Sequence, residues 1–537
     1  MSHLLSFLIA AVVSLSLVAP VWADNEPRTG EPEKLGRVYF KTSCTPEAQK
    51  QFERALAMLH SFFFPETVKA FTAIPTTDPN CAIAYWGIAI SQRPNPLVGP
   101  FDAATLKRGL DAIEKGEAIG PKTQRERDWL AALKEFYKDY DKVDQDTRTK
   151  NYAKAMERLA AKYGDDAEAK IFYALALNET FDHKSMEPLL RAIKILEPID
   201  KKYPDHPGVT HYLIHSYDFP PIAQKGIPAA NKYAQIAPSA PHAQHMPSHI
   251  YSMVGMWEES VKSNWRSVAV ANDYTAKAKL DGTLGGVPHA YDFMAYAYLQ
   301  LGKDREAKRV IDELRAVTKL SGARSYGADT GSIAPASRYV LERAAWAEAA
   351  ALEVPSNKYT YAEAMPRFAR AVGAARTRNL DLAKDEIARL QTLSKSAENS
   401  YWAEQIQVLV LAASAWRTRA EGRKDDALKF MRAAADLEDS TEKHVSMENR
   451  LYPMREMLGD LLLELGQPAA ALQAYEASLH VAQNRLHGFY GAAKAAQAAG
   501  DRSKARAYFE KLAALGKNAD PDRAELHEAK AFLLAQR

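Results

Sequence analysis

The segment ELGQPAAA at residues 464–471 is followed 34 residues later by AAGDRSKA at residues 498–505. Each segment has a glycine that can end a helix in the left-handed conformation. Each also has a small residue five positions later, where a second helix can cross the first closely. The same glycine-to-small-residue step occurs at Gly255–Ser260, Gly302–Ala307 and Gly422–Ala427. Strand-like alternation is nearly absent, so we expect an all-α solenoid of helix-turn-helix repeats.

Histidines in the N-terminal half follow the same period. His211 and His215 recur 34 residues later as His245 and His249, and Tyr217 recurs as Tyr251. Residues four apart lie on one face of a helix, and a step of one whole repeat preserves that face. The spacing therefore predicts four imidazoles on one wall of the solenoid.

Composition and the N-terminus limit the class of protein. The chain has 537 residues and a formal net charge of +3. So small an excess of positive charge does not indicate binding to nucleic acid or to an anionic membrane. Residues 4–18 are uncharged and largely apolar, and Ala23 closes a V-x-A motif, although no Lys or Arg precedes the apolar run. This pattern predicts a cleaved secretory signal at residues 1–23, too short for a membrane span. We expect a periplasmic or secreted protein with no membrane span.

Two cysteines, Cys44 and Cys81, are the only ones in the chain. In an oxidising compartment, a pair separated by about one repeat is expected to form a disulfide. The alternative is two buried free thiols.

Several strings carry a family resemblance. The period and the small-residue signatures resemble tetratricopeptide proteins over nearly the whole mature chain. More narrowly, the chain is similar to a family of exported bacterial tetratricopeptide proteins in LHSF (59–62), DPNCAIAYWGIA (78–89), HMPSHI (245–250) and YPMREMLGD (452–460). The resemblance implies a solenoid fold and export, and it names no reaction.

Tetratricopeptide proteins bind partners in a concave groove, through fixed positions of each repeat. This resemblance places His211, His215, His245 and His249 at groove positions. It adds six possible neighbours of the site: His242, His289, Asp292, Asp218, Tyr296 and His60. Pro247 departs from the pattern because proline interrupts a helix. A helix that begins late would leave His242 and His245 on a loop.

Two stretches break the repeat. A 13-residue excess falls near Gly282–Gly286, directly after the histidine repeats. Such a glycine-rich loop is expected to be either a lid over the groove or a connector. Residues 321–335 lack an apolar period. The expected organisation is an N-terminal array at 24–320 carrying the groove, an irregular connector at 321–335, and a C-terminal array at 336–537.

Three uses of the histidine cluster compete. A metal site needs three or four imidazoles or carboxylates around one ion, and copper, zinc and iron all accept such ligands. Three histidines with an open position would resemble catalytic zinc, whereas two histidines with Asp292 or Asp218 would resemble an iron facial triad. Imidazoles could instead bind a peptide or anion in the groove. Finally, the histidines could be buried helix residues without a ligand.

We interpret the chain as an exported superhelix whose groove holds a transition metal on His211, His215, His245 and His249. Whether the metal serves an enzyme stays open, and no catalytic residue is assigned. The alternative is a periplasmic adaptor that binds a protein or peptide in the groove without metal. A small-molecule or peptide ligand is expected in either case.

Overall fold

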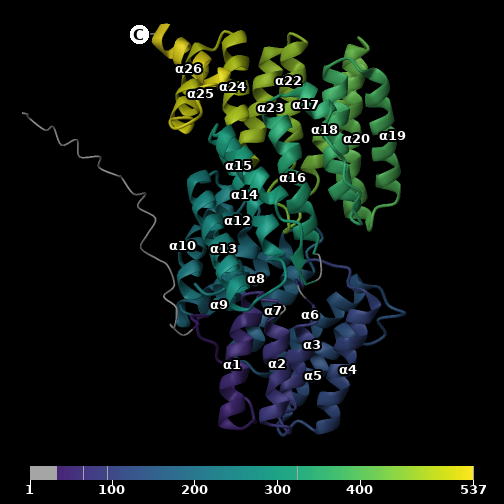
Figure 1. Ribbon diagram of the computed structural model, residues 1–537, viewed down its shortest axis with the longest axis vertical. Coiled ribbons are helices and arrows are strands. Elements are labelled where there is room, and N and C mark those ends of the chain that lie inside the picture. The colour runs from purple at the N-terminus through teal and green to yellow at the C-terminus, as the bar shows by residue number, and fades with distance from the viewer. Residues whose placement is uncertain (1–32, 65, 94, 323–324, 536–537) are drawn as a thin grey trace, which may run out of the picture. The chain divides into compact units, whose positions relative to one another are not determined.

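A computed structural model describes residues 33–64, 66–93, 95–322 and 325–535. The chain is built almost entirely of helices (Figure 1), and the predicted all-α solenoid is confirmed. The N-terminal helices are α1 (Pro46–His60), α2 (Glu66–Thr77), α3 (Ile83–Ile90), α4 (Ala103–Ile119), α5 (Gln124–Tyr137), α6 (Gln145–Lys162), α7 (Ala167–Glu179), α8 (Glu187–Lys202), α9 (Pro207–Tyr217), the 3-10 helix η1 (Ala223–Gly226), α10 (Ile227–Ile236), α11 (Pro241–His245), α12 (Pro247–Met253), α13 (Trp257–Lys277), α14 (Gly286–Gln300) and α15 (Asp304–Arg315).

The C-terminal helices are α16 (Tyr326–Glu342), α17 (Trp346–Ala350), α18 (Thr360–Arg376), α19 (Leu380–Lys395), α20 (Ser400–Ala420), α21 (Lys424–Asp439), α22 (Met454–Glu464), α23 (Pro468–Val481), α24 (Leu486–Ala498), α25 (Arg502–Leu515) and α26 (Ala524–Ala535). Two short parallel strands, β1 (Thr283–Leu284) and β2 (Leu320–Ser321), pair with each other. Within the described ranges, no helix is both long and apolar enough to cross a membrane. The predicted signal at residues 1–23 lies outside the described residues.

The glycine and the small residue of each repeat have the structural roles that the sequence predicts. Gly466 and Gly500 have φ values of 73° and 81°, and each ends the first helix of its pair. Ala471 and Ala505 are fully buried where α23 packs on α22 and α25 packs on α24. A glycine tolerates the left-handed turn, and an alanine lets the following helix approach closely. The chain therefore has a tetratricopeptide-like helix-turn-helix fold.

Apolar packing divides the chain near the end of α15. One large cluster of buried apolar residues runs from Leu35 to Leu314, and another runs from Tyr326 to Ala505. Helices α14 and α16 pack along each other across this division. The two arrays are therefore in continuous contact through these two helices.

The prediction of an irregular connector at 321–335 is wrong for most of that range, because helix α16 begins at Tyr326. The Ser325 side chain caps this helix by accepting a hydrogen bond from the amide of Ala328. Helix α16 buries polar residues such as Asp329, Thr330 and Arg338 together with apolar ones such as Val340 and Leu341. A Cβ on Gly331 would lie only 2.7 Å from the Cα of His289. Because buried polar residues and a close-packed glycine interrupt the apolar pattern, a search for apolar periodicity does not detect this helix.

The glycine-rich loop before α14 contacts β2 and α16, whereas a lid over the site would contact the histidines. Most of the extra length lies in α13, which has 21 residues. The loop itself is held by the pairing of β1 with β2. The nearest neighbours of a Cβ on Gly282 would be Lys319 and Leu320, and that of Gly285 would be Ala328. These described contacts include no predicted site histidine, and the helix that packs against His289 is α16.

The predicted disulfide is confirmed. Cys44 and Cys81 are bonded, with Cα atoms 4.9 Å apart across 37 residues of sequence. The bond joins the residues preceding α1 to those preceding α3, so it closes the first helical repeat. Such a cross-link stabilises a fold mainly by restricting the unfolded chain.

Candidate metal centre

Four helices carry the histidines of the site. His211 and His215 lie on α9, His242 and His245 on α11, His249 on α12, and His289 on α14. Pro247 separates α11 from α12 without leaving a loop between them. Met246 keeps helical angles of −52° and −36°, and its amide donates to the carbonyl of His242. The concern that His242 and His245 lie on a loop is therefore wrong, since both belong to a short helix.

The six imidazoles form two groups of three. The ligand nitrogens of His211, His215 and His242 lie within 4.8 Å of one another, and so do those of His245, His249 and His289. We call these groups the first triad and the second triad. His242 and His289, expected only as possible neighbours, are full members. The four principal histidines of the sequence hypothesis are divided two and two, rather than gathered in one set.

The cluster is buried rather than open as a groove. Relative exposure is 0% for His211, 4% for His215, 3% for His245 and 2% for His249, while His242 and His289 are half-buried. The sequence predicts these side chains on the wall of an open groove, whereas in the structure they are largely buried and contact the rings of Phe62 and Phe293.

Outer hydrogen bonds fix the orientation of three rings. The Nδ1 atom of His211 lies 2.6 Å from the carbonyl oxygen of His60, that of His245 lies 2.6 Å from Oδ1 of Asn264, and that of His249 lies 2.8 Å from Oδ2 of Asp218. Asn264 donates its amide nitrogen to the carbonyl of Ser260, which leaves its oxygen facing His245. An oxygen acceptor requires the proton on Nδ1. The Nε2 atoms of these rings therefore carry lone pairs.

Those lone pairs face inward. In the second triad, Nε2 of His245 and Nε2 of His249 are 3.0 Å apart. Both nitrogens are acceptors, so no hydrogen bond can join them in the neutral rings. In the first triad, Nε2 of His211 lies 3.1 Å from Nε2 of His242. The side chain of His215 has neither ring nitrogen paired within the described chain, although both are buried.

Burial keeps the rings neutral. It lowers the pKa of His245 to about 4, and it lowers the pKa of the other five imidazoles well below the usual value. Desolvation is the main cause in each case, because a charged ring is disfavoured away from water. Neutral imidazole is the form that binds metal, so all six rings are ready ligands at neutral pH.

Asp218 sits behind the second triad rather than within it. Its Oδ2 accepts from His249 and also from the Nζ of Lys443, each at 2.8 Å. Burial raises the pKa of Asp218 to about 6, and Lys443 opposes that rise. Lys443 is itself only 2% exposed and comes from the loop between α21 and α22, in the C-terminal array. Sequence reasoning missed it, since no periodicity links residues 225 positions apart.

The other expected neighbours have different partners. Asp292 pairs with Arg338 at 3.1 Å, and the hydroxyl of Tyr296 accepts from Arg485. His60 donates from Nε2 to Glu168 at 3.0 Å and contributes only its backbone carbonyl to His211. Asp292, Tyr296 and His60 were expected only as possible neighbours of the site, and their side chains are engaged elsewhere in this structure. Each of these side chains is already paired with a charged group.

His60 belongs to a separate buried network. Glu168 accepts from His60 and His206, each at 3.0 Å, and Tyr212 hydrogen-bonds to the second ring nitrogen of His60. The two histidines and nearby hydrogen bonds depress the pKa of Glu168 strongly, against the effect of burial. Since every ring nitrogen here has a partner, the network holds α1, α7 and α9 together. It positions the carbonyl that orients His211.

Arg338 anchors the loop that delivers Lys443. Its guanidinium donates to the carbonyl oxygens of Asn449, Arg450 and Leu451, in the loop between α21 and α22. It also lies 3.8 Å from the carboxylate of Glu448, whose pKa burial raises to about 8. The helix α16 that carries Arg338 therefore touches both the second triad and this loop.

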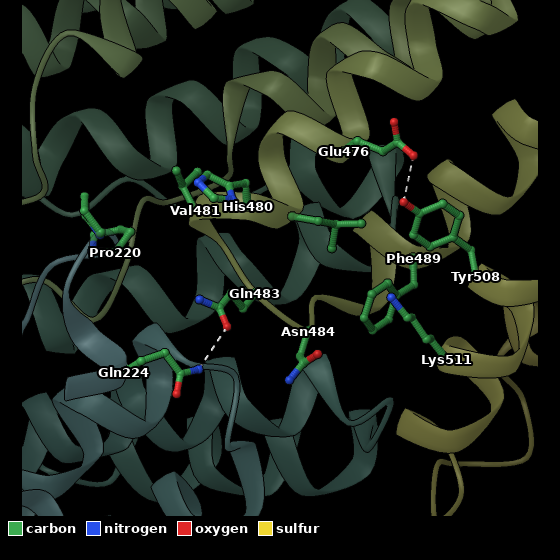
Figure 2. Close-up of a pocket in the computed structure, with 12 residues that line it drawn as sticks. Pro220, Gln224, Glu476, His480, Val481, Gln483, Asn484, Phe489, Tyr508 and Lys511 are labelled. Carbon is green, nitrogen blue, oxygen red and sulfur yellow. Dashed lines mark hydrogen bonds between the residues drawn. The ribbon is translucent and has the colours of Figure 1, made fainter. Parts of the chain in front are cut away.

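A separate pocket lies on another part of the chain (Figure 2). It has a volume of about 590 Å³ and is lined by Pro220, Pro221, Gln224, Glu476, Leu479, His480, Val481, Gln483, Asn484, Phe489, Tyr508 and Lys511. In Figure 2, Gln224 donates a hydrogen bond to Gln483, and Tyr508 donates one to Glu476. None of the predicted site residues lines this pocket. It brings the segment around η1 close to α23, α24 and α25.

Comparison with known proteins adds little. No protein-family model and no curated protein matches the chain. Among solved structures, it aligns with the crystal structure of the APC/C hetero-tetramer Cut9-Hcn1 at 13% sequence identity and a TM-score of 0.32. The alignment covers 91% of this chain and 90% of that chain. So weak a likeness carries no information about a ligand or partner, and the function must be argued from the histidines.

Proposed function

We propose that this protein is an exported solenoid that binds a transition metal through its buried histidine cluster. The observation that carries the proposal is the pair of acceptor nitrogens of His245 and His249, 3.0 Å apart. Their outer nitrogens are engaged by Asn264 and Asp218. Two lone pairs at this distance repel each other unless a positive centre lies between them.

A metal ion satisfies this geometry. Zinc binds imidazole nitrogen at about 2.0–2.1 Å, so one ion can contact both Nε2 atoms across 3.0 Å. Oxygen acceptors on the outer nitrogens are the usual support for metal-binding histidines, because they fix the tautomer and raise the basicity of the ligand. A metal ion would likewise give a partner to the acceptor nitrogen of His215, one of its two buried and unpaired ring nitrogens.

The donor set narrows the choice of metal. Copper, zinc and iron all accept imidazole. The two carboxylates considered as ligands, Asp218 and Asp292, are held by Lys443 and Arg338. This arrangement disfavours the iron site of two histidines and one carboxylate. Three imidazoles leave an open position on zinc or copper, as in catalytic rather than structural sites. We therefore extend the proposal to a metal-dependent reaction on a small ligand.

Export belongs to the proposal as well. It is supported by the apolar stretch at residues 4–18 and by the bond between Cys44 and Cys81, since disulfides persist in oxidising compartments. The N-terminus of the secreted protein, read by mass spectrometry, would test it. Cleavage after Ala23 is expected, and an intact N-terminus in a cytosolic fraction would contradict export.

Metal analysis of a variant tests the metal assignment. Full-length protein purified without chelators is expected to carry transition metal, and the double variant His211→Ala/His249→Ala is expected to lose it with helix content nearly unchanged. His480→Ala is the matched control, because this histidine is exposed and far along the chain. Retention of metal by the double variant would place the site elsewhere.

A second function, peptide binding without metal, is favoured by one observation. The pocket in Figure 2 has apolar, aromatic and charged lining and lies apart from the histidines. A peptide there would contact Phe489 and Lys511. If the natively purified protein holds no metal and cannot be loaded with one, this adaptor function becomes the better account.

A further inference from the structure

We infer that the cluster holds two metal ions side by side, one on each triad, with a small anion bridging them. The inference rests on the proposed function and goes beyond it in the number of ions and the class of ligand. Each triad brings three ligand nitrogens within 4.8 Å of one another. Three histidines per ion is a common protein set, with the next position open to water or substrate.

The two triads are built alike. In the first, the ring of Phe62 packs against His211, His215 and His242, with centroid distances of 4.5, 5.9 and 5.5 Å. In the second, the ring of Phe293 packs against His245, His249 and His289, at 4.8, 4.8 and 5.1 Å. Each set of three imidazoles thus has its own phenylalanine.

Both triads also receive outer support of the same kind. His211 in the first triad donates to a carbonyl, and His245 and His249 in the second donate to an amide oxygen and a carboxylate. In each triad, at least one Nε2 lone pair is therefore turned toward its neighbours. An ion on the second triad alone would leave the buried ring nitrogens of His215 without a partner, and an ion on the first triad alone would leave the facing acceptors of His245 and His249 unsatisfied.

The triads are close enough to share a ligand. The rings of His215 and His249 have centroids 6.1 Å apart, and those of His242 and His245 are 5.9 Å apart. Two-metal sites in proteins commonly hold their ions about 3.5–4 Å apart. Adjacent triads at this separation suit two ions joined by a ligand of one or two atoms.

Charge balance indicates that this ligand is an anion. Six neutral imidazoles add no negative charge to two cations. The nearest carboxylates are already paired, Asp218 with Lys443 and Asp292 with Arg338. Buried charge is costly unless it is compensated. A bridging hydroxide or another small anion supplies the missing charge and fills the open position on both ions. The anion would enter from the side of His242 and His289, the two histidines of the cluster that are only half-buried.

Copper loading tests the inference on the whole chain. Metal-free protein is incubated with Cu(II), and bound copper is counted by mass spectrometry of the digested sample. Two copper ions per chain are expected, with an electron paramagnetic resonance signal weaker than that copper content, since bridged Cu(II) ions couple. His242→Ala and His289→Ala each remove a half-buried ligand from one triad. Each is expected to retain one copper ion, with a signal of full intensity.

The outcomes separate the two proposals. One copper ion per chain, lost in both variants, would overturn the two-ion centre and leave the metal-binding function standing. Two ions with a signal of full intensity would overturn the bridging anion. No bound copper, zinc or iron would overturn both proposals. The wild-type count decides the number of ions even if a variant fails to fold, and His480→Ala is the control for loss of an unrelated histidine.

Discussion

Asn264 shows how a single neighbouring side chain fixes the protonation of a histidine in the site. Its amide donates to the carbonyl of Ser260, so its oxygen is the atom that faces His245. This single contact fixes which nitrogen of His245 carries the proton. The opposite nitrogen is then free to bind metal. His60 and Asp218 do the same for His211 and His249.

Removing one of these hydrogen bonds should lower the affinity for metal while all six histidines stay in place. Asn264→Ala deletes the acceptor of His245, and loss of such an outer partner commonly lowers metal affinity about 10–100-fold. Competition with a chelator would measure the change. Asn231→Ala is the matched control, since Asn231 accepts from Tyr251 elsewhere. Equal affinity in the two variants would show that the hydrogen bond to His245 is irrelevant to metal.

The buried histidines also predict a pH dependence of the metal-free protein. Burial lowers the folded pKa of His245 to about 4, below the ordinary value of about 6.5 in the unfolded chain. Between these values the unfolded chain binds a proton that the folded chain does not. The free energy of unfolding therefore falls as the pH drops below about 6.5, and His245 contributes about 2 kcal/mol of this loss at about pH 5.

Thermal unfolding of metal-free protein tests this sign. The melting temperature is expected to be lower at about pH 5 than at about pH 7.5. The other five rings are shifted in the same direction and add to the effect. An equal or higher melting temperature at the acidic pH would mean that the rings are not held neutral.

At the scale of the helix, close approach positions the second triad. Helix α16 lies against the start of α14 because Gly331 has no side chain where the backbone of Pro288 and His289 passes. A Cβ there would lie 2.7 Å from both the Pro288 carbonyl oxygen and the His289 Cα. Neither backbone atom can move away cheaply.

Gly331→Ala should therefore lower both stability and metal binding. We expect a loss of about 1–3 kcal/mol, the usual cost of overpacking, together with weaker binding at the triad that contains His289. Gly286→Ala is the control, because a Cβ at Gly286 has nothing within 4 Å. Urea denaturation and metal titration would measure the two effects. Equal behaviour of the two variants would contradict the close packing of α16 on α14.

Much of the fold and half of the site follow from periodicity. The 34-residue step identified the solenoid, the helix-ending glycines and the shared face of His211, His215, His245 and His249. His242 and His289 came from the resemblance to tetratricopeptide groove positions rather than from this step. The effect of Pro247, left open by the sequence, is limited to the junction of α11 and α12, because proline is tolerated at the start of a helix, where its missing N–H has no intrahelical partner.

The remaining features have no local signal in the sequence. Helix α16 has no clear apolar period, since it buries polar residues such as Asp329, Thr330 and Arg338 as well as apolar ones. Lys443 comes from a loop in the other array, and His60 contributes through its backbone rather than its ring. Spacing along one helix cannot predict such contacts. It also cannot predict that a face expected to line a groove is covered by other elements.

Across the whole molecule, the site depends on contact between the two arrays. The C-terminal array supplies Lys443 to the carboxylate of Asp218, and both side chains are almost completely buried. Arg338 holds the loop that carries this lysine. A solenoid transmits contacts mainly between neighbouring repeats, so this long-range pair is a specific link between distant parts of the chain.

Lys443→Met should reveal this link. Removing one partner of a buried ion pair commonly costs about 3–5 kcal/mol, because the remaining charge is uncompensated. Adding Asp218→Asn removes that charge, so the double variant should regain part of the loss. Unfolding free energies of the wild type, both single variants and the double variant give the coupling. Simple addition of the two losses would show that the pair does not interact.

The location of bound metal tests the central claim most directly. Crystals of natively purified protein, measured at the absorption edge of the metal found in the sample, report where that metal lies. Anomalous density is expected at about 2.0–2.1 Å from Nε2 of both His245 and His249, with a second peak at the triad of His211, His215 and His242. Ordered side chains in both triads without any anomalous density, or density only elsewhere, would contradict it.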